Sequence, residues 1–380
     1  MKHKEIYFDN NATTKPLPEV REEVLKVMDS EFGNPSSVHS AGARARRHVA
    51  QAREELSELI GSDTSMITFT GSGTESNNMA FYSCTRDKSN GCRILTTTVE
   101  HSSIQKMCNF LKLNGVEVIK LEVNPEGLID LDELKEAIKE TASLVSVQWV
   151  NNETGVIQPV SEIGGICSEM GVPFHTDAAQ AVGKLEMNIR EMPIDFFSLT
   201  GHKFHSPQGI GALYCKDRFL LAPMLFGGFQ EEGFRPGTEN VPGIAGMGKA
   251  AEIRRKNLPE LISTMKELRD RFEAMVLDFV PGSKVNGDTK NRVCNTSNIM
   301  FGGVDGRKLV KGLDQNGVRC SQSSACTNFE TAPSYVLRAM GLTEEEAYSS
   351  IRFSFSVENT FNEIDYAVKT IRELTVKLKN

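Results

Sequence analysis

The first 240 residues alternate short apolar runs with segments in which apolar residues recur at helical spacing. Short apolar runs bounded by turn residues predict buried strands, and the 3.6-residue period predicts helices. The predicted strands are Met66–Thr70, Arg93–Thr98, Val116–Val123, Leu144–Val150, Val172–His175, Phe196–Leu199 and Gly209–Cys215. The predicted helices lie near Val20–Met28 and over Ala43–Ile60, Leu131–Ile138 and Ser161–Met170. Strands that alternate with helices indicate an α/β fold with a mostly parallel, doubly wound sheet.

After about Gly243 the pattern changes, because a long helical region leads to Asp278 and shorter elements follow. A long helix followed by short strands and helices is typical of a smaller α+β domain. The predicted elements there are the strands Thr296–Phe301 and Ile351–Ser356 and the helices Arg307–Asn316, Pro333–Met340 and Asn362–Leu378. We therefore expect residues 15–250 to form a large domain, and residues 1–14 and 251–380 to form a small one.

Composition narrows the functional classes. The chain has 380 residues and a net charge of -7, without a massed basic block, which argues against nucleic-acid binding as its main activity. No apolar run reaches the roughly 18 residues that span a bilayer. The N-terminal stretch lacks the apolar segment of a secretory signal, so we expect a cytoplasmic location without a membrane partner.

Eight cysteines are scattered along the chain without a CxxC pair. We expect neither a disulfide scaffold nor a metal site, and most of these cysteines should be small buried hydrophobic residues.

Ligands of doubly wound sheets bind beyond the carboxyl ends of the strands, so the polar residues there are the candidates for chemistry. The segment Gly71–Asn77, GSGTESN, follows a predicted strand and opens a helix. The glycines, including Gly73, and the free amides of a helix start favour a phosphate, and the Thr74 hydroxyl adds a donor. The third glycine of a dinucleotide fingerprint and the lysine of a Walker motif are both missing. A plain helix cap is the alternative interpretation.

Other strand ends carry His101, Asn152, Asp177 with Gln180 after it, and Lys203. A lone histidine is more often structural, but a phosphate cradle, an imidazole, an amide, a carboxylate and a lysine together fit pyridoxal 5′-phosphate (PLP). Its aldehyde forms a Schiff base with a lysine, its ring nitrogen needs an acidic partner, and its phosphate suits a helix start. A nicotinamide cofactor would not need the lysine. Lys203, placed between two apolar runs, is thus the predicted Schiff-base residue.

Cys326 differs from the other cysteines. Small polar residues surround it from Ser321 to Asn328, and Pro333 opens the next helix. This pattern predicts a mobile loop, in which an exposed cysteine favours a functional role. Cys320, six residues earlier, is predicted to be structural.

Several motifs together resemble the cysteine desulfurases of the NifS/IscS type, in the class V aminotransferase group with PLP fold type I. The resemblance extends from about residue 6 to residue 375. The motifs are FDNNATT, FGNPSSVHSAG, FTGSGTESNN, VEHSSI, VNNETG, HTDAAQAVGK, SLTGHKFHSPQGIGALY, RPGTEN, SSACT and PSYVLRAMG.

The resemblance implies a role for each matching residue. Lys203 would bind the cofactor and move the substrate α-proton, and the Cys326 thiolate would take sulfur from L-cysteine as a persulfide, releasing L-alanine. The other implied roles are ring stacking and proton transfer by His101, pairing with the pyridine nitrogen by Asp177, a bond to the phenolic oxygen from Gln180, phosphate binding by Thr74, Thr200 and His202, and substrate carboxylate binding by Asn152 and Arg352. Thr238 would reach the phosphate of a neighbouring subunit, which implies a homodimer. A sulfur-acceptor protein is also implied, and an iron–sulfur scaffold, a tRNA- or DNA-thiolating system and a cofactor pathway all stay open as its identity.

Three alternatives stay open at this point. A selenocysteine lyase or another PLP-dependent class V enzyme would share Lys203 and Asp177 without needing a loop thiol. A nicotinamide oxidoreductase is disfavoured by the missing third glycine. A non-enzymatic scaffold for iron–sulfur assembly would have no cofactor.

Overall fold

The computed structural model describes residues 5–86, 91–139, 142–322 and 332–379. Its largest sheet has seven strands in the order β2-β8-β7-β6-β5-β3-β4. These strands are β2 (Ile67–Thr70), β3 (Arg93–Thr97), β4 (Glu117–Leu121), β5 (Leu144–Ser146), β6 (Phe174–Asp177), β7 (Phe196–Thr200) and β8 (Gly211–Cys215). Strand β8 is antiparallel to both of its neighbours, and the remaining four pairings are parallel. The predicted α/β fold with a mostly parallel sheet is confirmed.

Helices pack around this sheet because each carries an apolar stripe that must be buried. They are α1 (Pro18–Ser30), α2 (Ser40–Ile60), α3 (Gly73–Thr85), α4 (Ser102–Leu113), α5 (Leu131–Ile138) and α6 (Val160–Glu169). Helix α2 ends at Gly61, whose φ of 68° is the left-handed conformation that glycine adopts without strain. Every residue of β5, β6, β7 and β8 is buried.

The C-terminal part forms a second, smaller unit. It contains the antiparallel sheet β12-β10-β9, made of β9 (Ser283–Val285), β10 (Thr296–Phe301) and β12 (Ser350–Ser354). Its helices are α8 (Gly306–Gln315), α9 (Tyr335–Ala339), α10 (Glu344–Tyr348) and α11 (Phe361–Lys379). Strand β1 (Ile6–Tyr7) pairs in parallel with β11 (Val318–Arg319), so the start of the chain lies against its C-terminal part.

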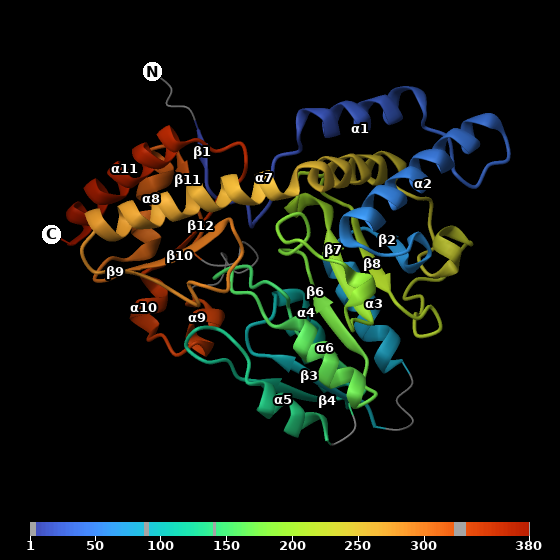
Figure 1. The fold of residues 1–380 in the computed structure, drawn as a ribbon, viewed down its shortest axis with the longest axis horizontal. Coiled ribbons are helices and arrows are strands. Elements are labelled where there is room, and N and C mark those ends of the chain that lie inside the picture. The colour runs from blue at the N-terminus through green and yellow to red at the C-terminus, as the bar shows by residue number, and fades with distance from the viewer. Residues whose placement is uncertain (1–4, 87–90, 140–141, 323–331, 380) are drawn as a thin grey trace.

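Helix α7 (Val241–Phe279) connects the two units (Figure 1). Its first half, up to Met265, packs into the apolar cluster of the large sheet. Its second half contributes Leu268, Phe272 and Val276 to the separate cluster of the C-terminal sheet. The predicted boundary at residue 250 falls inside this helix, and the division into domains there stays a prediction.

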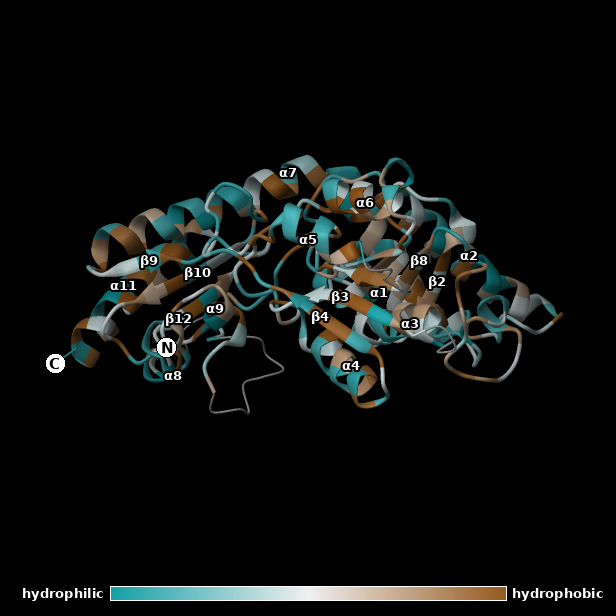
Figure 2. Cartoon of the chain, turned by 90° about the horizontal axis from the view of Figure 1, so that it is seen from below, coloured by the Kyte–Doolittle hydropathy of each residue, from teal (hydrophilic) through white to brown (hydrophobic). Residues whose placement is uncertain are grey.

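Hydrophilic residues gather on outer helices such as α5 and α8, which are largely teal in Figure 2. The strands of both sheets are mostly buried and apolar. Among the described helices, none combines the length and the apolar character that crossing a membrane requires.

Two differences between the predicted and the observed elements lie next to the polar strand ends. The regular ladder of β5 ends at Ser146, although the amides of Val147 and Trp149 still donate to carbonyls of β6 at 3.1 and 3.0 Å. The segment continues beside β6 as far as Trp149 and then leaves the sheet to form the turn that carries Asn152. Helix α4 was not predicted, although Ile104 and Cys108 lie at helical spacing and are buried.

Candidate active site

A cavity of about 470 Å³ opens at the carboxyl ends of β2, β3, β5, β6 and β7. The geometry of parallel strands places their polar end residues together at this edge. All predicted site residues except two line it, namely Gly73, Thr74, His101, Asn152, Asp177, Gln180, Thr200, His202, Lys203 and Arg352.

Lys203 lies in a short 3₁₀ turn, Gly201–Lys203, between the antiparallel strands β7 and β8. A Cβ at Gly201 would lie 2.5 Å from Ser206 Oγ, so the tight turn requires glycine there. The Lys203 ammonium donates to the carbonyls of Asn11 and Ala12 at 2.5 and 2.8 Å. The two flanking strands therefore fix the lysine backbone while its amine faces the cavity.

Asp177 ends β6 and is only 3% exposed. Its carboxylate accepts hydrogen bonds from Asn77 Nδ2 at 2.8 Å and from the Ala179 amide at 3.0 Å. Both donors stabilise the charged form of a carboxylate that borders the cavity.

Asn77 also links Asp177 to His101. Its Nδ2 donates to Ser103 Oγ at 2.9 Å, and Ser103 Oγ lies 2.8 Å from His101 Nδ1. The Ser103 amide donates to the same Nδ1 at 3.2 Å, so the imidazole caps the start of α4. Because Nδ1 accepts this bond, the neutral ring carries its proton on Nε2. The sequence did not identify Asn77, although it lies one turn after Thr74 on α3.

The start of α3 forms the anion-binding end of the cavity. Ser72 caps the helix through a bond to the Glu75 amide, and the first two helical amides, of Gly73 and Thr74, have no partner among the described residues. A Cβ at Gly73 would lie 3.3 Å from Thr200 Cβ, so glycine lets the helix start approach the end of β7.

His202 lies beside this anion-binding end, and its Nδ1 is 3.1 Å from Thr13 Oγ1. Burial, together with the nearby charges of Lys203, Lys184 and His101, lowers the pKa of His202 to about 4. At neutral pH the ring is uncharged, so its role toward an anion is hydrogen bonding.

Arg352, on β12, is 1% exposed and closes the cavity from the C-terminal unit. Its Nη2 lies 2.6 Å from Asp9 Oδ1 and its Nη1 donates to the Asn152 carbonyl at 3.0 Å. The buried Nε has no partner among the described residues, and the same is true of Gln148 Oε1 on the cavity wall.

Asn11 connects the two units at the cavity floor. Its carbonyl accepts from Lys203 and, at 2.9 Å, from Gln180 Nε2. Its Nδ2 donates to Thr296 Oγ1 at 2.8 Å, and its amide donates to Ser354 Oγ at 2.9 Å. The sequence contained the motif FDNNATT, but nothing in its spacing showed that Asn11 would meet residues 169 to 343 positions away.

The residues present fit PLP. The cavity joins a lysine, a buried carboxylate and a helix start with free amides, and unsatisfied polar atoms border it. Among the described residues no group of three or more His, Cys, Asp or Glu side chains could hold a metal ion. Lys203 would hold the aldehyde carbon, Asp177 the ring nitrogen, and the start of α3 with Thr200 and His202 the phosphate.

Two predicted residues are not among the lining residues. Thr238 is exposed and lies outside the cavity. Cys326 lies in segment 323–331, outside the described residues. On one side of that segment Ser321 Oγ donates to Asp9 at 2.9 Å, and on the other side Ser334 Oγ donates to Glu153 at 2.6 Å. Asp9 and Glu153 adjoin Arg352 and Asn152, so both flanks are fixed beside the cavity.

The described cysteines behave as small apolar residues. Five are buried, while Cys84 and Cys320 are partly buried. Burial raises the pKa of Cys84, Cys108, Cys167 and Cys215 to about 12, and it also raises the pKa of Cys320. These thiols stay protonated at neutral pH, which is unfavourable for a nucleophile.

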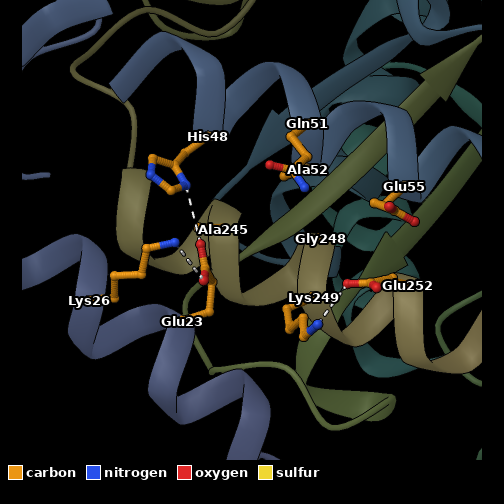
Figure 3. Close-up of a pocket in the computed structure, with 10 residues that line it drawn as sticks. All are labelled: Glu23, Lys26, His48, Gln51, Ala52, Glu55, Ala245, Gly248, Lys249 and Glu252. Atoms are coloured by element: carbon orange, nitrogen blue, oxygen red, sulfur yellow. Dashed lines mark hydrogen bonds and ion pairs between the residues drawn. The ribbon is translucent and has the colours of Figure 1, made fainter. Parts of the chain in front are cut away.

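A second, smaller hollow of about 120 Å³ lies between α1, α2 and α7 (Figure 3). Its charges pair with one another, since His48 Nδ1 lies 3.2 Å from Glu23 and Lys249 Nζ lies 2.8 Å from Glu252. The His48–Glu23 contact joins α2 to α1, whereas the Lys249–Glu252 pair lies within α7.

Comparison with known proteins gives consistent matches over the whole chain. A family model described as aminotransferase class-V matches residues 6–367. A cysteine desulfurase from Trichormus azollae is 42% identical over 374 residues, covering 98% of this chain and 94% of that protein. The solved structure of a NifS-like protein superposes with a TM-score of 0.93 at 32% identity, covering 99% of this chain and 100% of that one. A structure described as SspA in complex with cysteine has a TM-score of 0.83 at 32% identity, covering 94% of this chain and 100% of that one.

Proposed function

This chain belongs to the class-V aminotransferase family and is a PLP-dependent cysteine desulfurase, and from that premise we propose which of its residues carry out the reaction. The observation that carries the proposal is the meeting of Lys203, Asp177 and the free amides of α3 at one cavity. When bound, PLP withdraws electrons from the α-carbon of an attached amino acid and so weakens the bonds at that carbon.

Asp177 would hold the protonated ring nitrogen, which would keep the bound cofactor electron-withdrawing. Its two donors, Asn77 and the Ala179 amide, orient the carboxylate. His101 would stack on the ring and assist proton transfer. Gln180 would donate from Nε2 to the phenolic oxygen.

Lys203 would hold the cofactor and, as a free amine, would take the α-proton of the substrate and return it. The Asn11 and Ala12 carbonyls, which accept from its ammonium, orient the amine during this transfer.

Arg352 and Asn152 bind the carboxylate of L-cysteine. The structure supports this because Arg352 lines the cavity with a buried Nε donor that has no partner among the described residues. A planar guanidinium matches the geometry of a carboxylate, and the attraction between the two charges is stronger where water is excluded.

Cys326 attacks the sulfur of the substrate as a thiolate. A bond forms between the two sulfur atoms, the carbon–sulfur bond of the substrate breaks, and protons complete L-alanine. The balance is one thiol and one L-cysteine converted to one persulfide and one L-alanine, without an outside oxidant. The anchored flanks of segment 323–331 and the high pKa values of the described thiols support this assignment.

The active enzyme is a homodimer in which Thr238 reaches the phosphate bound by the partner subunit. Arg235, three residues earlier, is held by Glu75 on α3 at 2.9 Å, which fixes the segment that carries Thr238. Phe226 and Phe229, at 86% and 85% exposure, lie in the segment just before it and suit a covered interface. We also propose a cytoplasmic location and a sulfur-acceptor protein such as an iron–sulfur scaffold.

Two variants test the assignment. Lys203→Ala should lose the visible absorption of the bound cofactor and the mass added by borohydride reduction, and an unchanged spectrum would contradict the role of Lys203. Cys326→Ser should keep that absorption and form neither persulfide nor alanine, whereas Cys320→Ser should retain both products. Alanine formation at the wild-type rate by Cys326→Ser would overturn the nucleophile assignment.

A further inference from the structure

Lys184 is a buried lysine that the proposed reaction does not use. It lies in the turn after β6, is 3% exposed, and is not among the residues that line the cavity. Its ammonium donates to Gln180 Oε1 at 2.5 Å and to Asn11 Oδ1 at 3.3 Å. Both acceptors belong to residues that do border the cavity.

The position of this ammonium is energetically unfavourable, because it is buried. Burying a charge without a counter-ion is strongly unfavourable, and Lys184 forms no ion pair with a described residue. The ionisable groups that act on it are the Cys294 thiol, Lys203, Arg254 and Arg352, and none of these is a carboxylate. Burial lowers the pKa of Lys184 to about 7, Cys294 opposes this shift, and the three cations add to it. A negatively charged ligand oxygen beside Gln180 would raise this pKa again and so keep the ammonium charged. Two amide oxygens are its hydrogen-bond acceptors.

The contact decides which way the Gln180 amide faces. An ammonium only donates, so the oxygen of Gln180 must face Lys184. Its Nε2 must then face the Asn11 carbonyl, which it reaches at 2.9 Å, and the cavity. One N–H is used by that carbonyl, and the second is left for a ligand. If the Gln180 amide were reversed, its oxygen would face the Asn11 carbonyl oxygen, and its NH₂ group would face the Lys184 ammonium. Both contacts would be repulsive.

We propose that Lys184 is a positioning residue that holds the Gln180 amide with an N–H toward the cavity, and that its charge stabilises a negatively charged ring oxygen of the bound cofactor. The inference rests on the role proposed above for Gln180. It goes further because it states that Lys184, a residue that does not line the cavity, determines that Gln180 acts as a donor toward the cofactor.

Three variants distinguish the effect of the Lys184 charge, the effect of its hydrogen bond to Gln180, and the effect of removing any buried cation nearby. Lys184→Met removes the charge and both donors, and Lys184→Gln removes the charge but keeps an N–H for Gln180. Arg254→Met is the matched control, because it removes another buried cation that contacts the same turn from helix α7. Arg254 is 2% exposed and donates to the Gly183 carbonyl at 3.4 Å.

For each purified variant, PLP affinity is measured by equilibrium dialysis, and the loaded protein is titrated from about pH 6 to pH 10 while its visible absorption is recorded. Lys184→Met should weaken PLP binding about tenfold and raise the midpoint of the spectral titration by about one pH unit, because a lost positive charge makes a nearby proton easier to bind. Lys184→Gln should regain most of the affinity but keep the raised midpoint. Arg254→Met should change the midpoint by less than half as much as Lys184→Met.

The proposal is overturned if both Lys184 variants keep the wild-type affinity and midpoint. It is also overturned if Arg254→Met shifts the midpoint as far as Lys184→Met, or if Lys184→Met has its full effect when Gln180 is already leucine. A failure of the proposed function would look different, because the wild-type protein would then bind no PLP at Lys203 at all.

Discussion

Arg352 and Asp9 form an ion pair at the cavity, with Nη2 2.6 Å from Oδ1. The arginine that we assign to the substrate carboxylate is therefore held by a carboxylate of the protein itself. Asp9 in turn accepts from Ser321 Oγ, so one side chain orients Arg352 and fixes a flank of the segment that carries Cys326.

Asp9→Asn should lower the free energy of unfolding of the cofactor-free protein by about 3 kcal/mol, because a buried cation loses its counter-charge. The KM for L-cysteine should rise several-fold, since Arg352 loses its orientation. Asp365→Asn is the matched control, because the Asp365–Arg271 pair is exposed and contributes under about 1 kcal/mol. Urea unfolding and steady-state kinetics measure both effects, and equal stability losses in the two variants would contradict the importance of the buried pair.

Asn77→Ala should weaken PLP binding about tenfold, because Asp177 loses a hydrogen bond and Ser103 loses the donor that connects it to Asp177. Asn78→Ala is the control, since among the described residues the Asn78 side chain bonds only the Thr74 carbonyl of its own helix. Equilibrium dialysis compares the two. If both variants bind PLP as the wild type does, Asn77 has no part in orienting Asp177.

Glu100→Gln should stabilise the protein increasingly as the pH rises. Burial raises the pKa of Glu100 to about 8, although bonds from the Gln148 amide and Thr97 oppose the shift. The folded chain therefore keeps a proton that the unfolded chain releases above its ordinary pKa of 4.5. The stability contributed by the protonated acid is lost as the pH rises towards 8, at up to about 1.4 kcal/mol per pH unit. Glutamine has no proton to lose, so unfolding midpoints of the two proteins should diverge between pH 6 and pH 8; parallel curves would show that Glu100 is already ionised.

The wild-type protein should become less stable as the pH falls from about 6.5 to about 4. Burial lowers the pKa of His175 to about 4 and that of His205 to about 3, as it does for His202. The unfolded chain binds protons in this range that the folded chain does not, so acid favours unfolding. Urea unfolding at half-unit pH steps should show this trend, and proton uptake on unfolding near pH 5.5 should exceed one. A flat profile would mean that these rings are protonated in the folded state.

The sequence predicted the site residues best where they lie at or directly after the end of a strand. Asp177, Lys203 and the start of α3 follow β6, β7 and β2, and the rule that ligands bind beyond strand ends identified them. The structure brings them together at one cavity, as that rule requires.

Asn11 and Lys184 were missed for a physical reason. Their importance arises from contacts across the fold, since Asn11 bonds residues in both units and Lys184 acts behind the cavity wall. No local period encodes such contacts. Helix α4 was not predicted because its N-cap is His101, a residue type that does not mark a helix start as Ser, Thr, Asp or Asn does.

The position of Asn11 has a consequence for protein synthesis. The second unit supplies Arg352 to the cavity and the Ser354 hydroxyl to the Asn11 amide. A nascent chain that has not yet been extended past Ser354 has Lys203 but lacks Arg352 and the hydrogen-bond acceptor of the Asn11 amide. PLP can therefore meet a complete pocket only after residue 354 has been synthesised, and a premature stop near residue 340 would leave the site without Arg352.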